Sequence, residues 1–252
     1  MTIHRAFRLL DKVPEHSPGV EELFGRLTGD FALTIVTTNW DIMAERCLQR
    51  RGIDIVYEVS PDVRHPEAPR AGLPVWRLHG SGNWGYCDLC RNLITSELDL
   101  GKIAVRFQLL LEAEDFKLFR GGARHARNLD ATLRACPWCG GRVAVRVATF
   151  SYRKHLEPSF FYSIWDSARN SLSQADRWLF VGYSLPEADI EIRQLLKTAE
   201  LASPHERRPR IDVVLKRDDG GRLRYDRLFG RSVHSIDNRG LATWINSCLP
   251  NY

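Results

Sequence analysis

The chain has 252 residues, of which 44% are hydrophobic and 27% are charged, and its formal net charge is +5. These proportions are ordinary for a water-soluble protein with one large domain and a smaller module. No apolar run approaches the ~18 residues of a transmembrane helix, and the first residues lack the apolar core of a signal peptide. We therefore expect a cytoplasmic protein with no membrane partner. Six cysteines fit a reducing compartment better than a disulfide framework.

The first third of the chain predicts alternating helices and strands. Apolar residues recur at helical spacing after Pro18, and the β-branched run Phe31–Thr37 predicts a buried parallel strand. The expected elements are a helix over 18–29, a strand over 31–37, a helix over 41–51, a strand over 53–57, a loop over 58–74 and a strand over 75–78.

The alternation resumes after a cysteine-containing segment at about 84–145. The expected elements are a helix over 160–172, a strand over 178–182, a helix over 186–201, a strand over 211–215 and a helix over 240–248. Strands and helices that alternate at these lengths predict an α/β fold, in which a parallel sheet has helices on both faces.

Four cysteines form two Cys-x-x-Cys pairs, Cys87-Asp-Leu-Cys90 and Cys136-Pro-Trp-Cys139. Two such pairs supply the four thiolates of a structural zinc site, with sulfur at about 2.3 Å from the metal. The alternatives are two separate reduced thiol pairs, or a redox pair without its usual βαβ context. Residues 91–135 lie between the pairs, so we expect one small module with an insertion. The two remaining cysteines, Cys47 and Cys248, are predicted to be small core residues.

Polar residues follow the first predicted strand, where ligands of open parallel sheets bind. The segment Thr37-Thr38-Asn39-Trp40-Asp41 places an amide and a carboxylate at a turn between strand and helix. These groups can hydrogen-bond sugar hydroxyls or a carboxamide. The alternative is that Asn39 or Asp41 only caps the next helix.

Two later strands also end in polar residues. His79 leads into Gly80-Ser81-Gly82, predicted to be a loop, and histidine is the usual general base near neutral pH. A purely structural or exposed histidine is the alternative. Gly182-Tyr183-Ser184 precedes a helix predicted to hold Pro186 in its first turn, an arrangement that suits a phosphate contact. Alternatively, Ser184 is a simple N-cap.

In combination, the ordered motifs Thr-Thr-Asn-x-Asp, His-Gly-Ser, two Cys-x-x-Cys pairs and Gly-Tyr-Ser resemble the sirtuin family, over roughly residues 31–216. The resemblance implies a Rossmann-like NAD-binding large domain formed by 1–83 and 146–252, and a zinc-ribbon module with a helical insertion at 84–145. It also implies NAD-dependent cleavage of the nicotinamide–ribose bond, by a protein deacylase that acts on an acylated protein or by an NAD hydrolase.

The same resemblance implies a role for each matching residue. Asn39 would orient the ribose and a water molecule, Asp41 would hold the nicotinamide carboxamide, and His79 would be the general base that acts on a ribose hydroxyl. The implied cofactor-binding residues are Thr37, Thr38, Gly182, Ser184 and Lys216. The implied ligands of the structural zinc are Cys87, Cys90, Cys136 and Cys139.

The chain also departs from the family pattern. Only 36 residues precede Thr37, and they hold no Gly-Ala-Gly phosphate loop, so we expect the family's first strand to be missing or supplied by a companion segment. Ala148–Ser151 stands where typical deacetylases have Phe-Gly-Glu, and Trp40 replaces an aliphatic residue. These changes resemble divergent bacterial sirtuin-like proteins, some of which hydrolyse NAD.

We rank two other hypotheses below that of an NAD-consuming enzyme. One is a catalytically impaired module that binds NAD or ADP-ribose. The other, ranked last, is a zinc-ribbon protein that binds nucleic acid through Arg120–Arg127, with binding that weakens steeply as salt rises.

Overall fold

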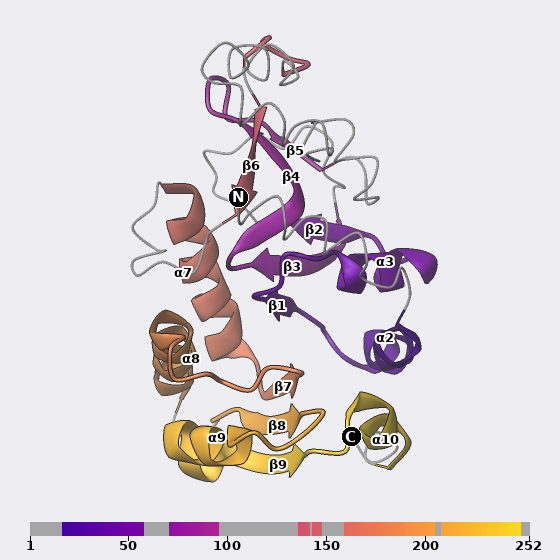
Figure 1. The fold of residues 1–252 in the computed structure, drawn as a ribbon, viewed down its shortest axis with the longest axis vertical. Coiled ribbons are helices and arrows are strands. Elements are labelled where there is room, and N and C mark those ends of the chain that lie inside the picture. Colours follow the sequence, from indigo (N-terminus) through magenta and orange to yellow (C-terminus); the bar gives the residue numbers. More distant parts are fainter. Residues whose placement is uncertain are drawn as a thin grey trace, which may run out of the picture. The chain divides into compact units, whose positions relative to one another are not determined.

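The computed structural model describes residues 17–57, 71–95, 136–141, 143–147, 159–204 and 208–247. The chain divides into two compact units (Figure 1). Unit 1 consists of Met1–Ser17 and Ile35–Phe161, and unit 2 consists of Pro18–Thr34 and Tyr162–Tyr252. Among the residues described, no helix combines the length and the apolar character that crossing a membrane requires.

Unit 1 contains a parallel sheet in the order β1-β3-β2, formed by Ile35–Thr37, Leu73–Arg77 and Ile55–Tyr57 respectively. Helix α3 (Met43–Arg50) connects β1 to β2 and buries Cys47 and Leu48 completely. Gly52 ends the helical segment at a φ of +70°, a value that favours glycine because it has no Cβ. The helix–strand alternation therefore arises as the apolar periodicity predicts.

A second, antiparallel sheet of unit 1 leads to the cysteines. Its order is β5-β4-β6, formed by Leu93–Ile94, Gly80–Cys87 and Val143–Val147. Only two residues separate the end of β3 from the start of β4, at Gly80 with a φ of +73°. The chain thus passes almost directly from the parallel sheet to Cys87 at the end of β4.

Unit 2 contains a parallel sheet in the order β7-β8-β9, formed by Arg177–Val181, Arg210–Val214 and Val233–Asp237. Its helices are α2 (Pro18–Asp30), α7 (Ser159–Gln174, in unit 2 from Tyr162), α8 (Ile190–Ala202), α9 (Gly221–Phe229) and α10 (Leu241–Ser247), and a short 3-10 helix, η3, covers Gly230–Ser232.

Helices cover both faces of the unit 2 sheet. The side chains of β7 show this, because successive residues of a strand point to opposite faces. Trp178 and Phe180 of β7 contact aromatic rings of α9, with centroid distances of 5.9 Å from Trp178 to Phe229 and 5.1 Å from Phe180 to Tyr225. Leu179, between them in sequence, packs against the opposite cluster, whose buried members are Leu23, Leu27, Val214, Trp244 and Ile245. This cluster joins α2 and α10 to the sheet.

Several sequence predictions are wrong in detail. The strand predicted over 31–37 covers only Ile35–Thr37 and is half-buried rather than buried. The segment after His79 is not a loop, because Gly80 already begins β4. The helix predicted from Pro186 begins at Ile190, and α9 and β9 were not predicted. Cys248, residues 58–70, the insertion from 96 to 135 with Arg120–Arg127, and Ala148–Ser151 lie outside the described residues.

Candidate active site and metal centre

The Thr37–Asp41 segment forms a tight turn between β1 and α3. The backbone N–H of Asn39 donates to Thr37 Oγ1 at 3.1 Å, and the N–H of Met43 donates to Asp41 Oδ1 at 3.1 Å. Asp41 therefore does act at the start of α3, although Ile42 holds the N-cap position. Asn39 is exposed. The turn thus orders its own backbone while the Asn39 side chain faces outward.

Side chains from the β3–β4 segment hold three of four successive carbonyl groups of this turn. Arg77 donates from Nη1 to the Asn39 oxygen at 2.7 Å and from Nη2 to the Asp41 oxygen at 2.6 Å. His79 Nδ1 lies 3.1 Å from the Thr38 oxygen. Ser81 Oγ lies 3.5 Å from the Trp40 oxygen, but its single proton goes to Asn83 Oδ1 at 2.6 Å. Arg77 and His79 therefore fix the backbone of the turn.

A buried acidic residue holds Arg77 in turn. Glu45 of α3 and Arg77 have side chains that are 0% and 1% exposed. Glu45 Oε1 accepts from Arg77 Nε at 2.7 Å and also from Nη2. Burial alone lowers the pKa of Arg77, but Glu45, Tyr57 and Asp41 together outweigh burial, and the net shift is upward. The guanidinium is therefore charged at all working pH values.

Three further polar side chains extend this arrangement. Tyr57 donates to Glu45 Oε1 at 3.4 Å and accepts from Asn83 Nδ2 at 3.1 Å, and Ser81 Oγ lies 2.6 Å from Asn83 Oδ1. Burial and the neighbouring Glu45 carboxylate raise the pKa of Tyr57, so its hydroxyl stays protonated. We call Glu45, Tyr57, Arg77, His79, Ser81 and Asn83 the clamp network.

The hydrogen bond of His79 defines the tautomer of its ring. Because a carbonyl oxygen only accepts, His79 Nδ1 carries the proton that it shares with Thr38, and the basic lone pair is on Nε2. His79 is 3% exposed. A buried imidazole that donates from Nδ1 to a backbone carbonyl has its ring orientation set by that contact. The structure thus places the His79 ring against the backbone of Thr38, the residue before Asn39.

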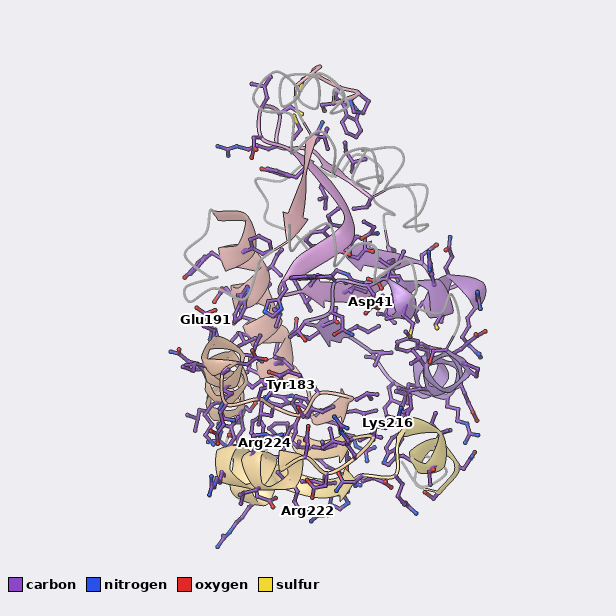
Figure 2. All side chains as sticks on the ribbon, viewed as in Figure 1. Asp41, Tyr183, Glu191, Lys216, Arg222 and Arg224 are labelled. Atoms are coloured by element: carbon purple, nitrogen blue, oxygen red, sulfur yellow. The ribbon has the colours of Figure 1, made fainter. Side chains whose placement is uncertain are left out.

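In unit 2, the predicted cofactor-binding residues follow β7 and β8. Gly182 adopts a φ of +72° directly after β7, and Lys216 is exposed just beyond β8 (Figure 2). Because β7 and β8 are parallel, both residues lie at the carboxyl edge of the sheet. The structure thus places Gly182 and Lys216 at the kind of edge where α/β sheets bind ligands.

The loop after Gly182 is held by side chains of α8 and α9. The carbonyl groups of Tyr183, Ser184 and Leu185 accept from Tyr225 Oη at 2.9 Å, Arg224 Nε at 2.9 Å and Arg193 Nη1 at 3.3 Å respectively. Since α8 starts only at Ile190, the helix start predicted at Pro186 is wrong, and so is the alternative that Ser184 is its N-cap. Ser184 belongs instead to a loop whose carbonyl groups accept from side chains of α8 and α9.

The four paired cysteines converge on one point. The Sγ atoms of Cys87 and Cys139 lie 3.5 Å apart, as do those of Cys90 and Cys136, and all four lie within 4.8 Å of one another. A tetrahedral zinc ion with bonds of about 2.3 Å separates its sulfur ligands by about 3.8 Å. A disulfide would need about 2.05 Å. The four thiols therefore fit a zinc ion, and we expect it to staple β4 to the 136–141 turn.

The surroundings of the cysteines shift their thiol pKa values in opposite directions. Burial alone raises the pKa of the Cys87 thiol, but backbone N–H groups of Cys90 and Leu89 and the Cys139 thiol lower it on balance, whereas burial raises the pKa of the Cys90 thiol to about 12. Gly141 donates its N–H to Cys139 Sγ at 3.4 Å. A Cβ at this glycine would lie 3.2 Å from the Sγ atoms of both Cys87 and Cys139, so a side chain would crowd the metal site.

No protein-family model matches the chain, and no curated protein matches it. Among solved structures, it is similar to a sirtuin determined to study the structural basis of sirtuin substrate affinity. The two share 11% sequence identity and align with a TM-score of 0.50, over 90% of this chain and 65% of the sirtuin. The chain has a sirtuin-like fold.

Other solved sirtuins align less well in space. A Sir2 bound to acetylated peptide shares 12% identity at a TM-score of 0.47, over 90% of this chain and 66% of that one. A Sir2 with a p53 peptide and NAD+ shares 13% identity at a TM-score of 0.43, again over 90% and 66%. The chain spans about two thirds of the length of these sirtuins.

Sequence reasoning missed most of the clamp network. Arg77, Ser81 and Asn83 are buried and polar, and with His79 they occupy every second position from 77 to 83. Alternate residues of an extended segment share one face, so this spacing predicts a polar face inside the sirtuin-like fold. The sequence around Glu45 gave no comparable indication of a buried polar residue, because the residues of α3 show ordinary helical spacing.

Proposed function

We propose that the chain cleaves the nicotinamide–ribose bond of NAD, as an NAD hydrolase or a protein deacylase. The observation that carries the proposal is the position of His79 against the Thr38–Asp41 turn. A buried imidazole whose Nδ1 is 3.1 Å from the Thr38 carbonyl has its orientation fixed at the turn that carries Asn39 and Asp41. The sirtuin-like fold supports the same reaction.

In this proposal, Asp41 accepts a hydrogen bond from the nicotinamide carboxamide, while Asn39 binds a ribose hydroxyl and a water molecule. The C1′–N bond breaks and its electron pair leaves with nicotinamide, which then needs no proton. His79 Nε2 accepts a proton from a ribose hydroxyl as positive charge on the ribose is quenched. With water as nucleophile, NAD and water give nicotinamide, ADP-ribose and a proton.

The remaining proposed contacts serve the rest of the cofactor. Thr37 and Thr38 shape the turn on the side of the ribose, with Thr37 Oγ1 bound to the Asn39 N–H. In unit 2, taken by itself, Gly182 and Ser184 are proposed cofactor-binding residues for a phosphate group, and the exposed ammonium of Lys216 complements phosphate charge. Zinc at the four cysteines would hold the small module together and take no part in bond cleavage.

Release of nicotinamide from NAD tests the proposal. The zinc-loaded chain is incubated with NAD, with and without an acetylated peptide, and nicotinamide and ADP-ribose are separated by chromatography. His79→Ala and Asn39→Ala should each lower the rate, His79→Ala by about 10²- to 10⁴-fold because it removes a general base. His234→Ala and Asn246→Ala, which alter exposed residues of unit 2, are matched controls and should keep the native rate.

The peptide distinguishes the two forms of the reaction. Release that needs the peptide indicates a deacylase, and release without it indicates a hydrolase. If the native chain releases no nicotinamide at high concentration, the proposal is wrong. Binding of ADP-ribose in a calorimeter without any turnover would then favour the impaired binding module.

A further inference from the structure

We propose that Arg77 is a positioning residue for this reaction, which sets the directions of the Asn39 and Asp41 side chains without touching NAD. The inference rests on the proposed function. Its basis is the set of hydrogen bonds that join one buried guanidinium to two carbonyl groups of the turn and to the Glu45 carboxylate.

The geometry of the backbone explains how Arg77 can act at a distance from the substrate. Each carbonyl group lies in a rigid peptide plane, so a hydrogen bond to the oxygen limits rotation of that plane. The Cα–Cβ bond of Asn39 lies between the planes held by His79 and Arg77, and Arg77 also holds the plane that follows Asp41. The planes on both sides of Asn39, and one of the two beside Asp41, are thus fixed.

Arginine is the residue type that this task requires. Its planar guanidinium presents several donors in fixed directions, whereas the lysine ammonium is a compact charge on a flexible stem. Here Nη1 and Nη2 reach the Asn39 and Asp41 oxygens, while Nε and Nη2 are held by Glu45. Lysine at position 77 keeps an ion pair with Glu45 but cannot make all of these contacts.

The clamp is not explained by stability alone. Both charged side chains are almost completely buried, and the desolvation of a buried ion pair commonly cancels its Coulomb attraction. A hydrophobic pair of similar volume would serve the core equally well. The position of the ion pair, directly beneath the backbone of the turn, instead favours a role in geometry.

The test compares Arg77→Lys with the native chain. We expect a fall in kcat of about tenfold to a hundredfold, since small displacements of a reacting group have effects of this size. Amide hydrogen exchange at Asn39 and Met43 should accelerate, while exchange in β8 (Arg210–Val214) stays unchanged. Arg26→Lys, which alters a half-exposed arginine paired with Glu22 in α2, is the matched control and should change neither quantity.

Each outcome decides the proposal. Faster exchange confined to the turn, together with lower kcat and an unchanged affinity for ADP-ribose, supports it. Unchanged exchange at Asn39 and Met43 overturns it, and so does faster exchange with a native kcat. If the native chain shows no turnover, the proposed function fails, and the exchange measurement alone then decides whether Arg77 holds the turn.

Discussion

The loss of Glu45 should destabilise unit 1 strongly. Glu45→Ala removes the acceptor of two Arg77 donors and of the Tyr57 hydroxyl, whose oxygen is 3.4 Å from Glu45 Oε1. It leaves a guanidinium in a site where the native side chain is 1% exposed. Breaking a buried ion pair in this way costs about 3–5 kcal/mol in the free energy of unfolding.

Two further variants separate the charge from the hydrogen bonds. Glu45→Gln keeps an acceptor oxygen, so its loss should be smaller, about 2 kcal/mol. The double variant Glu45→Leu/Arg77→Met removes both charges and should lose less than Glu45→Ala, although the turn carbonyls lose their donor. Glu22→Ala, which breaks an exposed pair with Arg26, should cost no more than about 1 kcal/mol.

Urea unfolding of chains that carry fluorotryptophan measures these changes. The fluorine resonance of Trp84 reports unit 1, because this side chain is 0% exposed and its ring centroid is 5.4 Å from that of Tyr57. A Glu45→Ala chain within about 1 kcal/mol of the native value would refute the reasoning. A Glu45→Leu/Arg77→Met chain that loses as much stability as the Glu45→Ala chain would also refute it.

Two smaller predictions concern the metal centre and unit 2. Gly141→Ala should weaken zinc binding about 10- to 100-fold in chelator competition, because its Cβ would crowd two sulfur ligands. Gly29→Ala is the control, because its Cβ would meet no atom within 4 Å. Equal zinc affinities of the Gly141→Ala and native chains would contradict the account. The Arg239 guanidinium lowers the pKa of the Asp237 carboxyl, so the stability that it adds is present above the ordinary aspartate pKa and is lost as pH falls through the depressed value. In Arg239→Ala the Asp237 carboxyl should therefore titrate at higher pH by NMR, and an unchanged titration would show that another group lowers the native pKa.

Much of the fold could be predicted because apolar spacing determines it locally. The helix after Pro18 and the helix of 159–174 follow their apolar stripes, and the cysteine pairs meet as their spacing predicts. The start of α8 was misplaced because Ser184 and Pro186 are both typical of helix starts. Leu185 instead takes a φ of +55°, and its carbonyl group accepts from Arg193, so the helix starts later.

Helix α9 could not be predicted with the same ease. Four of its nine residues are charged, and its buried residues Tyr225 and Phe229 are stabilised by rings from another element, such as Phe180 of β7. Tertiary packing of this kind overrides weak local preference. The four-residue spacing of Tyr225 and Phe229 was the available indication of a helix.

Of the candidate site, only the residues near strand ends were predicted from the sequence. Asn39, Asp41 and His79 stand at strand ends, where position alone suggests a ligand. The contact of Glu45 with Arg77 joins residues 32 positions apart and depends on the parallel register that pairs Thr37 with Arg77. Local sequence contains no information about that register. The groups that hold the turn therefore became visible only in three dimensions.

A crystal structure of the chain with NAD tests the central claim most directly. The account predicts the nicotinamide carboxamide within hydrogen-bond distance of Asp41, and the adjoining ribose between Asn39 and His79 Nε2. The backbone of the turn should keep its hydrogen bonds to Arg77. NAD bound with its nicotinamide ribose away from all three side chains would contradict the account.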